Sequence, residues 1–310
     1  MNEITTIDQF KIWGAEGGKK SRRTLSTVQA RSMGKRSVAA RQSHIIPKSK
    51  AAHGTQEWAS HNVNIQLGCE HDCKYCYAKS MGIRFKRCES STWGLPQILP
   101  DKVNAFPKKY SGKVMFPTTH DITPFNINEC ISVLTGLCGM GNEILIVTKP
   151  TFECIRRLCT ALAGYRKSIL FRFTIGSVDD SILSFWEPNA PLFSERKKSL
   201  IYAHQQGFKT SISCEPMLDV NPSLIINSVR EYVTNNIWLG RVNQLPAGIS
   251  LNCPEDDISK MAARELLKKQ SDQWILDLYT NWKDDKLIKW KDSIKKVVGI
   301  RRPTTKGLDI

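Results

Sequence analysis

The sequence predicts an α/β protein built as a partial (β/α)6 barrel, with a basic arm before it and a helical extension after it. Three observations support this fold class: short segments rich in Ile, Val, Phe and Thr recur along the chain, helical patterns lie between them, and six such segments are found. Each segment is bounded by Pro, Gly or polar residues, which is typical of strands. The six predicted strands are residues 61–67, 113–120, 142–150, 168–176, 209–216 and 235–243.

Helical patterns separate the later strands from one another. Ser194 is the predicted N-cap of one of these helices, and Gly207 is its predicted terminator. Strands that alternate with helices favour a parallel sheet with right-handed crossovers, and functional sites in such folds lie at the C-terminal ends of the strands. The predicted helices are residues 128–139, 152–164, 194–207 and 222–233.

The segment after the sixth strand is predicted to be a helical extension that is basic from about Asp256 onward. Trp274, Trp282 and Trp290 recur in it, and an aromatic stripe of this kind packs against a core more often than it binds a ligand. The predicted domains are a basic arm at 1–60, the barrel at 61–245 and this extension at 246–310.

The positive charge of the chain is concentrated in one segment. A total of 45 Lys and Arg against 29 Asp and Glu gives a formal net charge of +16, and residues 17–50 contain ten of these cations and no acidic residue. Such a block fits a polyphosphate partner such as nucleic acid. A solvated arm without a specific partner has the same composition, so both interpretations stay open.

The sequence also predicts the cellular compartment of the protein. It has no run of roughly 18 apolar residues, so we expect no membrane span. The N-terminus lacks the basic start and apolar stretch of a secretion signal. We therefore expect a cytoplasmic protein whose ten cysteines are thiols or metal ligands and not disulfides.

Three of these cysteines lie within eight residues, in the loop after the first predicted strand. Cys69, Cys73 and Cys76 form the pattern C-x3-C-x2-C, in which three thiolates can bind one face of a cubane iron–sulfur cluster and leave the fourth iron without a protein ligand. An open metal position is typical of a catalytic site. Two alternatives remain: a zinc site with His71 as the fourth ligand, and a cluster that only transfers electrons.

This motif, with the aromatic Tyr77 after it and a strand before it, resembles the radical S-adenosylmethionine (radical SAM) superfamily. Further stretches between about Asn62 and Asp219, among them "TTHDITPFN", "IVTKP" and "WEPNAPLFSERKKSL", are similar to its branch of spore photoproduct lyase and DNA repair photolyase-like proteins. The resemblance implies a TIM-like barrel of the radical SAM type and a 4Fe–4S cluster on the three cysteines. It also implies that S-adenosylmethionine is cleaved to a 5′-deoxyadenosyl radical, which takes a hydrogen atom from the substrate, and that flavodoxin or ferredoxin supplies the electron.

The resemblance implies roles for residues outside the cysteine loop as well. Tyr77 would contact the adenine side of S-adenosylmethionine, and Lys149 and Thr174 would contact its methionyl part. A cation at the end of a strand can pair with a carboxylate, although a lysine can also cap the strand at the surface and a threonine can be an ordinary strand residue. Asp121 either orients the ribose or the substrate, or starts the turn before Pro124.

Other residues in the matched stretches have weaker assignments. Glu187 and Arg196 are expected to pair and to shape a loop over the site, without a catalytic role. Enzymes similar to spore photoproduct lyase are expected to return a hydrogen atom to the substrate radical from a cysteine at the end of the second strand. This chain reads "FPTTHD" in that region and has no cysteine there. Cys214, at the end of the fifth strand, is the candidate replacement donor, and a buried free thiol is the alternative. Helical packing against the sheet is expected for Cys130, Cys138, Cys154 and Cys159.

The sequence thus predicts a radical SAM enzyme of unknown substrate, with DNA, RNA or a nucleotide favoured by residues 17–50. Two other function classes stay open. One is a zinc-stabilised nucleic-acid-binding protein without catalysis, and the other is a radical SAM enzyme that acts on a peptide or a small metabolite.

Overall fold

The computed structural model describes residues 51–242 and 245–308, and the basic segment 17–50 lies outside the described residues. Residues 51–310 form one compact unit, and the predicted division into arm, barrel and extension stays a prediction. The strands are β1 His61–Asn62, β2 Gln66–Leu67, β3 Gln97–Ile98, β4 Val114–Phe116, β5 Ile144–Thr148, β6 Ile169–Thr174, β7 Lys209–Cys214, β8 Ile237–Leu239 and β9 Ile288–Trp290.

Helices alternate with most of these strands. Short 3₁₀ helices cover Gly54–Glu57, Ala163–Ser168 and Arg230–Tyr232. The α-helices are α3 Tyr77–Arg84, α4 Pro100–Val103, α5 Ile127–Gly139, α6 Phe152–Ala161, α7 Asp180–Trp186, α8 Phe193–Gln205, α9 Pro222–Val229, α10 Leu245–Asn252, α11 Asp257–Lys269, α12 Asp272–Trp282 and α13 Asp292–Val298.

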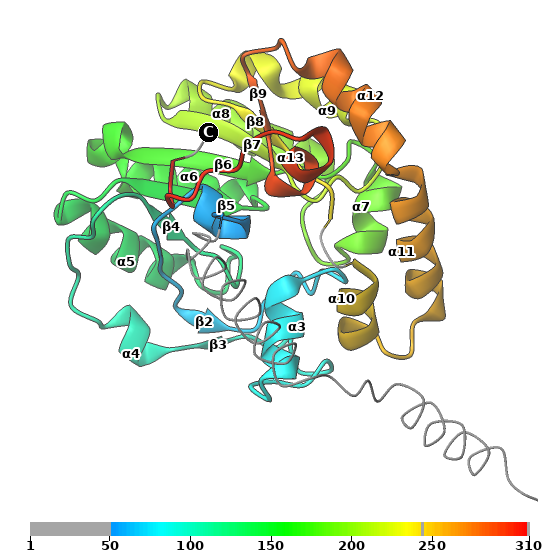
Figure 1. Ribbon diagram of the computed structural model, residues 1–310. Helices are drawn as coiled ribbons and strands as arrows, with labels where there is room; N and C mark the ends of the chain where they lie inside the picture. The colour runs from blue at the N-terminus through cyan, green and yellow to red at the C-terminus, as the bar shows by residue number, and fades with distance from the viewer. Residues whose placement is uncertain (1–50, 243–244, 309–310) are drawn as a thin grey trace, which may run out of the picture. The chain divides into compact units, whose positions relative to one another are not determined.

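A seven-stranded sheet lies at the centre of this unit (Figure 1). Its strand order is β1-β4-β5-β6-β7-β8-β9, and every neighbouring pair is parallel. The first six strands of the sheet come from the six segments predicted to be strands, and helices connect them. The α/β fold class with a parallel, TIM-like partial barrel is therefore confirmed.

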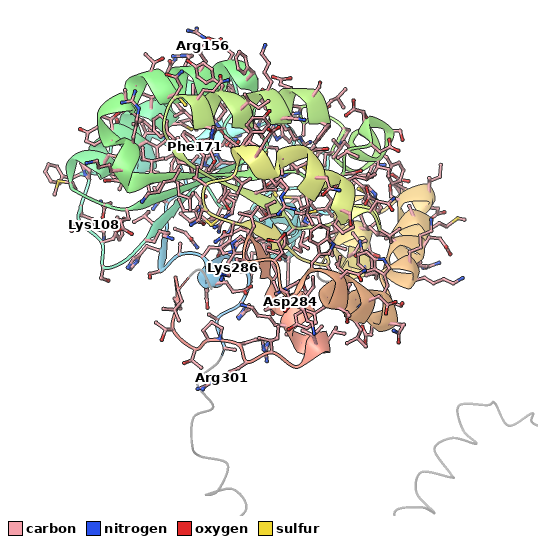
Figure 2. The ribbon with its side chains drawn as sticks, turned by 90° about the horizontal axis from the view of Figure 1, so that it is seen from above. Lys108, Arg156, Phe171, Asp284, Lys286 and Arg301 are labelled. Atoms are coloured by element: carbon pink, nitrogen blue, oxygen red, sulfur yellow. The ribbon has the colours of Figure 1, made fainter. Side chains whose placement is uncertain are left out.

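The outer face of the sheet carries the main apolar core. Alternate strand residues such as Ile146, Phe171 and Ile212 are fully buried there against helices α5, α6, α8 and α9. Figure 2 shows Phe171 in the interior, whereas Arg156 projects from the opposite surface of α6. The predicted packing of Cys130, Cys138, Cys154 and Cys159 from helices is confirmed, because all four belong to this core.

The inner face of the sheet is concave. Met115, Leu145 and Leu170 point to it, since successive strand residues alternate between faces. Trp58 precedes β1 at one end of the sheet, yet its ring centroid lies 5.7 Å from that of Trp238 in β8. A contact across the four strands between β1 and β8 requires the sheet to curl around Trp58, as a partial barrel does.

Three local details differ from the sequence-based expectation. The segment predicted as one strand at 61–67 divides in two, because Gln66 and Leu67 pair with β3 in a separate antiparallel hairpin. The N-cap of α8 is Leu192, two residues before the predicted N-cap Ser194. The N–H of Phe193 donates to the Asp180 carboxylate at 2.9 Å, so α7 supplies the capping group. Gly207 does end this helix, with a positive φ of 78°.

The third difference is the strand β9, which lies in the extension predicted to be helical. Ile288 and Trp290 point to the outer core, while Lys291 is fully buried on the inner side and pairs with Glu57 at 2.9 Å and Glu215 at 3.2 Å. The extension therefore completes the sheet. Among the described residues, no helix has the length and apolar character needed to cross a membrane.

Candidate active site

The cysteine loop connects β2 to α3 and curls tightly at its start. Gly68 has a φ of 81°, and a Cβ at this position would lie 2.7 Å from the carbonyl oxygen of Trp93. Only glycine fits this close approach without strain. Two backbone bonds within the loop, from Asp72 N to the Cys69 carbonyl at 3.2 Å and from Cys76 N to the Cys73 carbonyl at 3.0 Å, turn it twice and bring the three cysteines onto one short bend.

The three loop thiols are free and largely withdrawn from solvent. Cys69 and Cys73 are buried and Cys76 is half-buried. Burial raises the pKa of the Cys69 thiol to about 12 and raises the pKa values of Cys73 and Cys76 too. They are therefore thiols at neutral pH in the metal-free chain, and a metal must displace their protons to bind.

Within residues 51–242 and 245–308, no three His, Cys, Asp or Glu side chains converge on a single point as the ligands of one metal ion do. Cysteines that bind a cubane cluster each take a different iron, so they share a loop without converging on one point. His71, the fourth ligand of the zinc alternative, directs Nδ1 at the Asp121 carboxylate, 3.2 Å away. The residues present thus fit three ligands of a cluster better than four ligands of a zinc ion.

Asp121 follows β4 and joins the cysteine loop to the next strand. Its Oδ1 accepts from the backbone N–H of Ile122 at 2.9 Å and from the Thr148 hydroxyl, and both carboxylate oxygens accept from the N–H of Lys149. Burial alone would raise the pKa of Asp121, but the neighbouring His71 and Lys149 and these hydrogen bonds hold it well below its usual range. These contacts favour the interpretation in which Asp121 starts the turn before Pro124. They also indicate that Asp121 supports the cysteine loop.

Lys149 places a positive charge beside the thiols. Its Nζ lies 4.0 Å from Asp121 Oδ2 and 5.8 Å from the centroid of the Tyr75 ring, and its side chain is 15% exposed. Burial alone would lower the pKa of Lys149, but the Cys73 thiol and the carboxylates of Glu187 and Asp121 raise it. A charged lysine that retains access to solvent can still bind an incoming carboxylate.

Thr174 lies on the same face of the sheet as Lys149, and Tyr77 contacts the end of β4. Tyr77 opens α3, and its hydroxyl donates to the carbonyl of Thr118 at 2.5 Å, just after β4. Thr174 is the last residue of β6 and pairs in register with Ser213 of β7. Lys149 and Thr174 both continue the inner-face set of their strands, so the structure brings these two predicted residues to one edge.

Cys214 lies on the opposite face. It alternates with Ser213 in β7, and its side chain is fully buried in the outer core with Ile212 and Met217. This placement does not support Cys214 as a hydrogen donor to a substrate, and it agrees with the alternative of a buried free thiol. Alternation along "TSISC" already places Cys214 on the same face as Ile212.

The predicted pair of Glu187 and Arg196 is present and completely buried. Arg196 also donates to the carbonyls of Pro191 at 2.6 Å and Thr174 at 3.1 Å, and Tyr75 donates its hydroxyl to Glu187. The pair therefore links the cysteine loop, through Tyr75, to the end of β6 and to the loop after α7. Sequence reasoning missed Tyr75, although its position between Cys73 and Cys76 was a signal.

A second missed residue is Asn252, at the end of α10. It is buried, its amide donates to the carbonyls of Lys74 and Cys76 at 2.9 Å each, and its oxygen accepts from Ser80 at 2.9 Å. Nearby, Lys74 pairs with Asp256 at 3.1 Å. No spacing rule connects residues about 180 positions apart, so only the folded chain reveals that the extension holds the cysteine loop.

An open pocket of about 570 Å³ borders the cysteine loop on the His71 side. Residues from the loops after β4, β5 and α7 line it, and solvent reaches this side of the loop. Glu70, His71, Thr123 and Glu195 are among the lining residues.

Comparison with known proteins gives remote similarities. No protein-family model matches the chain. The uncharacterized protein ORF301 of Acidianus two-tailed virus is 25% identical over 176 residues, which cover 53% of this chain and 57% of the viral protein. This chain thus corresponds to little more than half of that relative.

Two kinds of solved structure are similar in outline. Spore photoproduct lyase complexed with dinucleoside spore photoproduct is 15% identical at a TM-score of 0.48, over 69% of this chain and 66% of the other. SuiB of Streptococcus suis bound to S-adenosylmethionine is 12% identical at a TM-score of 0.47, over 94% of this chain and 63% of the other. Because the match covers less than two thirds of either neighbour, the activity of this chain has to be argued from its own residues.

Proposed function

We propose that this protein is a radical SAM enzyme that binds a 4Fe–4S cluster through Cys69, Cys73 and Cys76. The observation that carries the proposal is the C-x3-C-x2-C loop, which lies at the C-terminal edge of a curled parallel sheet with the charged Lys149 beside it. The bound cluster would supply the electron that cleaves S-adenosylmethionine to a radical able to take a hydrogen atom from the substrate.

The remaining residues of the site would bind and orient S-adenosylmethionine. Lys149 would pair with the carboxylate of its methionyl part, with Thr174 alongside on the same face of the sheet. Tyr77, which is 54% exposed, has a free ring face for the adenine. The hydrogen bonds of Asp121 hold the His71 side of the cysteine loop and the backbone of Lys149 in one arrangement, so Asp121 would position both without touching the cofactor.

Electron supply and substrate complete the proposal. An electron donor such as flavodoxin or ferredoxin would reduce the cluster, and the open pocket beside His71 leaves that side of the loop accessible. The concentrated charge of residues 17–50 supports DNA, RNA or a nucleotide as the substrate, in the cytoplasm. A peptide or a small metabolite is the alternative substrate class.

Anaerobic reconstitution with iron and sulfide tests the activity. We expect the charge-transfer absorption of a 4Fe–4S cluster, and 5′-deoxyadenosine by mass spectrometry when dithionite and S-adenosylmethionine are added. Cys73→Ser should abolish both signals, whereas Cys253→Ser, a half-buried cysteine outside the loop, should retain them. A wild-type chain that gives neither signal would contradict the proposal.

The competing function is a zinc-stabilised nucleic-acid-binding protein. It requires one tightly bound zinc in the aerobically purified chain, no iron–sulfur absorption, and unfolding of the chain by Cys73→Ala. The described residues disfavour it, because no three of their His, Cys, Asp or Glu side chains converge as the ligands of one metal ion do.

A further inference from the structure

A row of exposed apolar side chains runs along α3, the helix that begins directly after the last cysteine of the loop. Tyr77, Met81 and Phe85 lie four residues apart and are 54%, 45% and 54% exposed. Four residues advance about 6 Å along a helix and make little more than one turn, so the three side chains lie on one face. The side of the helix that carries Ala78, Lys79 and Gly82 is buried against the protein.

Cations gather at the far end of this row. Arg84, Lys86 and Arg87 are exposed, and none of the three forms an ion pair with another residue in the part of the chain that the structure describes. The guanidinium of Arg87 lies 5.5 Å from the centroid of the Phe85 ring. An apolar row beside three exposed cations combines stacking surfaces with sites for phosphate.

The near end of the row reaches the candidate active site. The Tyr77 hydroxyl bonds the carbonyl of Thr118 at the end of β4, and Tyr77 follows Cys76 directly. In Figure 1, α3 lies between the β2–β3 hairpin and α10. A chain lying along α3 would therefore lead from the cations at Phe85 to the cysteine loop.

We propose that this surface, the α3 platform (Met81, Arg84, Phe85, Lys86 and Arg87), is a docking surface for a single-stranded stretch of nucleic acid. A base stacks on the exposed Phe85 ring, because every base has an aromatic face, and phosphates contact the cations. The charge of the platform selects this occupant, since a purely apolar partner would leave three cations desolvated without counter-charges. The proposal rests on the proposed function and names the element that presents its substrate.

Binding of an oligonucleotide tests the platform without turnover. The probe is fluorescein-labelled oligothymidylate of about 12 nucleotides, within the usual site size of such surfaces, and the protein is the full-length chain without reductant or S-adenosylmethionine. We expect Phe85→Ala to weaken binding about tenfold. We expect the double variant Arg84→Gln and Arg87→Gln to lower the slope of log affinity against log salt by roughly 0.7 for each cation removed.

Matched controls separate the platform from general effects of charge and exposure. Phe106→Ala removes an aromatic residue that is 89% exposed in the loop before β4. The double variant Lys286→Gln and Arg301→Gln, at two exposed cations labelled in Figure 2, makes the same change in net charge away from α3. Both controls should bind like the wild type. All variants keep residues 17–50, so any contribution of that segment is common to them.

A 2-aminopurine base within the oligonucleotide reports stacking directly. Its fluorescence should be quenched on binding and should recover in Phe85→Ala. Two outcomes overturn the proposal: α3 variants that bind like the controls, or weaker binding in the arginine variant while the bound 2-aminopurine fluoresces like the free probe. The second outcome would identify an electrostatic surface, as for an acidic protein partner. Because the assay needs no cluster, failure to form 5′-deoxyadenosine would count against the proposed function alone.

Discussion

Eight of the ten cysteines lie in two kinds of surroundings. Five of them, Cys214 and four from helices α5 and α6, pack in the outer core among Leu, Ile and Phe side chains. The three loop cysteines have apolar neighbours such as Ala78 and Trp93, but polar and charged groups from distant segments also lie beside the loop: the Asp121 carboxylate, the Lys149 ammonium and the Asn252 amide.

The acidity of the thiols does not separate these two regions. Burial raises the pKa of Cys159 in the core to about 12, and it raises that of Cys69 in the loop to about 12 as well. What differs is how the cations are shared. Lys149 opposes the effect of burial on all three loop thiols and would stabilise their thiolates, whereas in the core Arg157 acts on Cys154 and Arg166 on Cys159. A candidate metal site is thus recognised by several thiols that share one cation and not by how deeply they are buried.

The largest contrast is expected when one cysteine of the loop and one cysteine of the outer core are each replaced by serine. Cys73→Ser should reduce 5′-deoxyadenosine formation by more than about 100-fold, because even partners that only support a metal ligand cost 10–100-fold. Cys154→Ser should keep that activity but lower the free energy of unfolding by about 1–3 kcal/mol, since a hydroxyl replaces a thiol among apolar side chains. Iron content and urea unfolding measure the two effects, and a reversed pattern would contradict the comparison.

The next largest effect concerns the buried ion pair that holds the loop through Tyr75. Glu187→Gln leaves the Arg196 guanidinium buried without its counter-charge, so we expect the free energy of unfolding to fall by about 3–5 kcal/mol. Glu153→Gln, which breaks the exposed pair with Arg156, is the control and should leave the denaturation midpoint unchanged. Equal effects of the two variants in guanidinium unfolding would show that the Glu187 pair does not support the loop.

Removal of the Asn252 side chain tests whether the extension holds the cysteine loop. Asn252→Ala leaves the buried carbonyls of Lys74 and Cys76 without that donor, and we expect a loss of about 1–3 kcal/mol in the metal-free chain. Iron binding should weaken by about 10–100-fold. Asn128→Ala, which removes an exposed bond to Arg157, provides the control. Unchanged iron binding in Asn252→Ala would restrict this residue to a role in folding.

The smallest effect is expected at the N-cap of α11. The Ser259 hydroxyl and N–H, with Lys74, lower the pKa of Asp256 from 3.8 to about 2. Because the folded-state pKa is depressed, this stabilisation is complete above pH 3.8 and is lost as the pH falls toward 2. Asp256→Ala should cost about 1 kcal/mol near neutral pH. Asp256→Asn should keep the N-cap hydrogen bond and reduce the loss of unfolding free energy as the pH falls from 3.8 toward 2. The same loss in this variant and in the wild type would refute the role of Asp256 in the acid dependence of stability.

Sequence patterns were sufficient where one segment carries the whole signal. The strand β6 is buried on both faces and reads as the nearly continuous apolar run "ILFRFT", so its position was predictable. The strand β9 was not, because "IKWK" alternates apolar residues with lysines and resembles an exposed surface. Lys291 is buried only because Glu57 and Glu215 meet it from segments far away in the chain.

The sequence by itself determined the candidate ligands and their neighbourhood: three cysteines at cluster spacing, after the first strand of a repeated strand–helix pattern. That information is local, because one short loop carries all three thiols. Only the tertiary structure decided which groups surround them and that Asn252 and Glu187 hold the loop. Buried polar groups must find partners wherever the fold supplies them, and those partners are set by three-dimensional proximity that no spacing in the chain encodes.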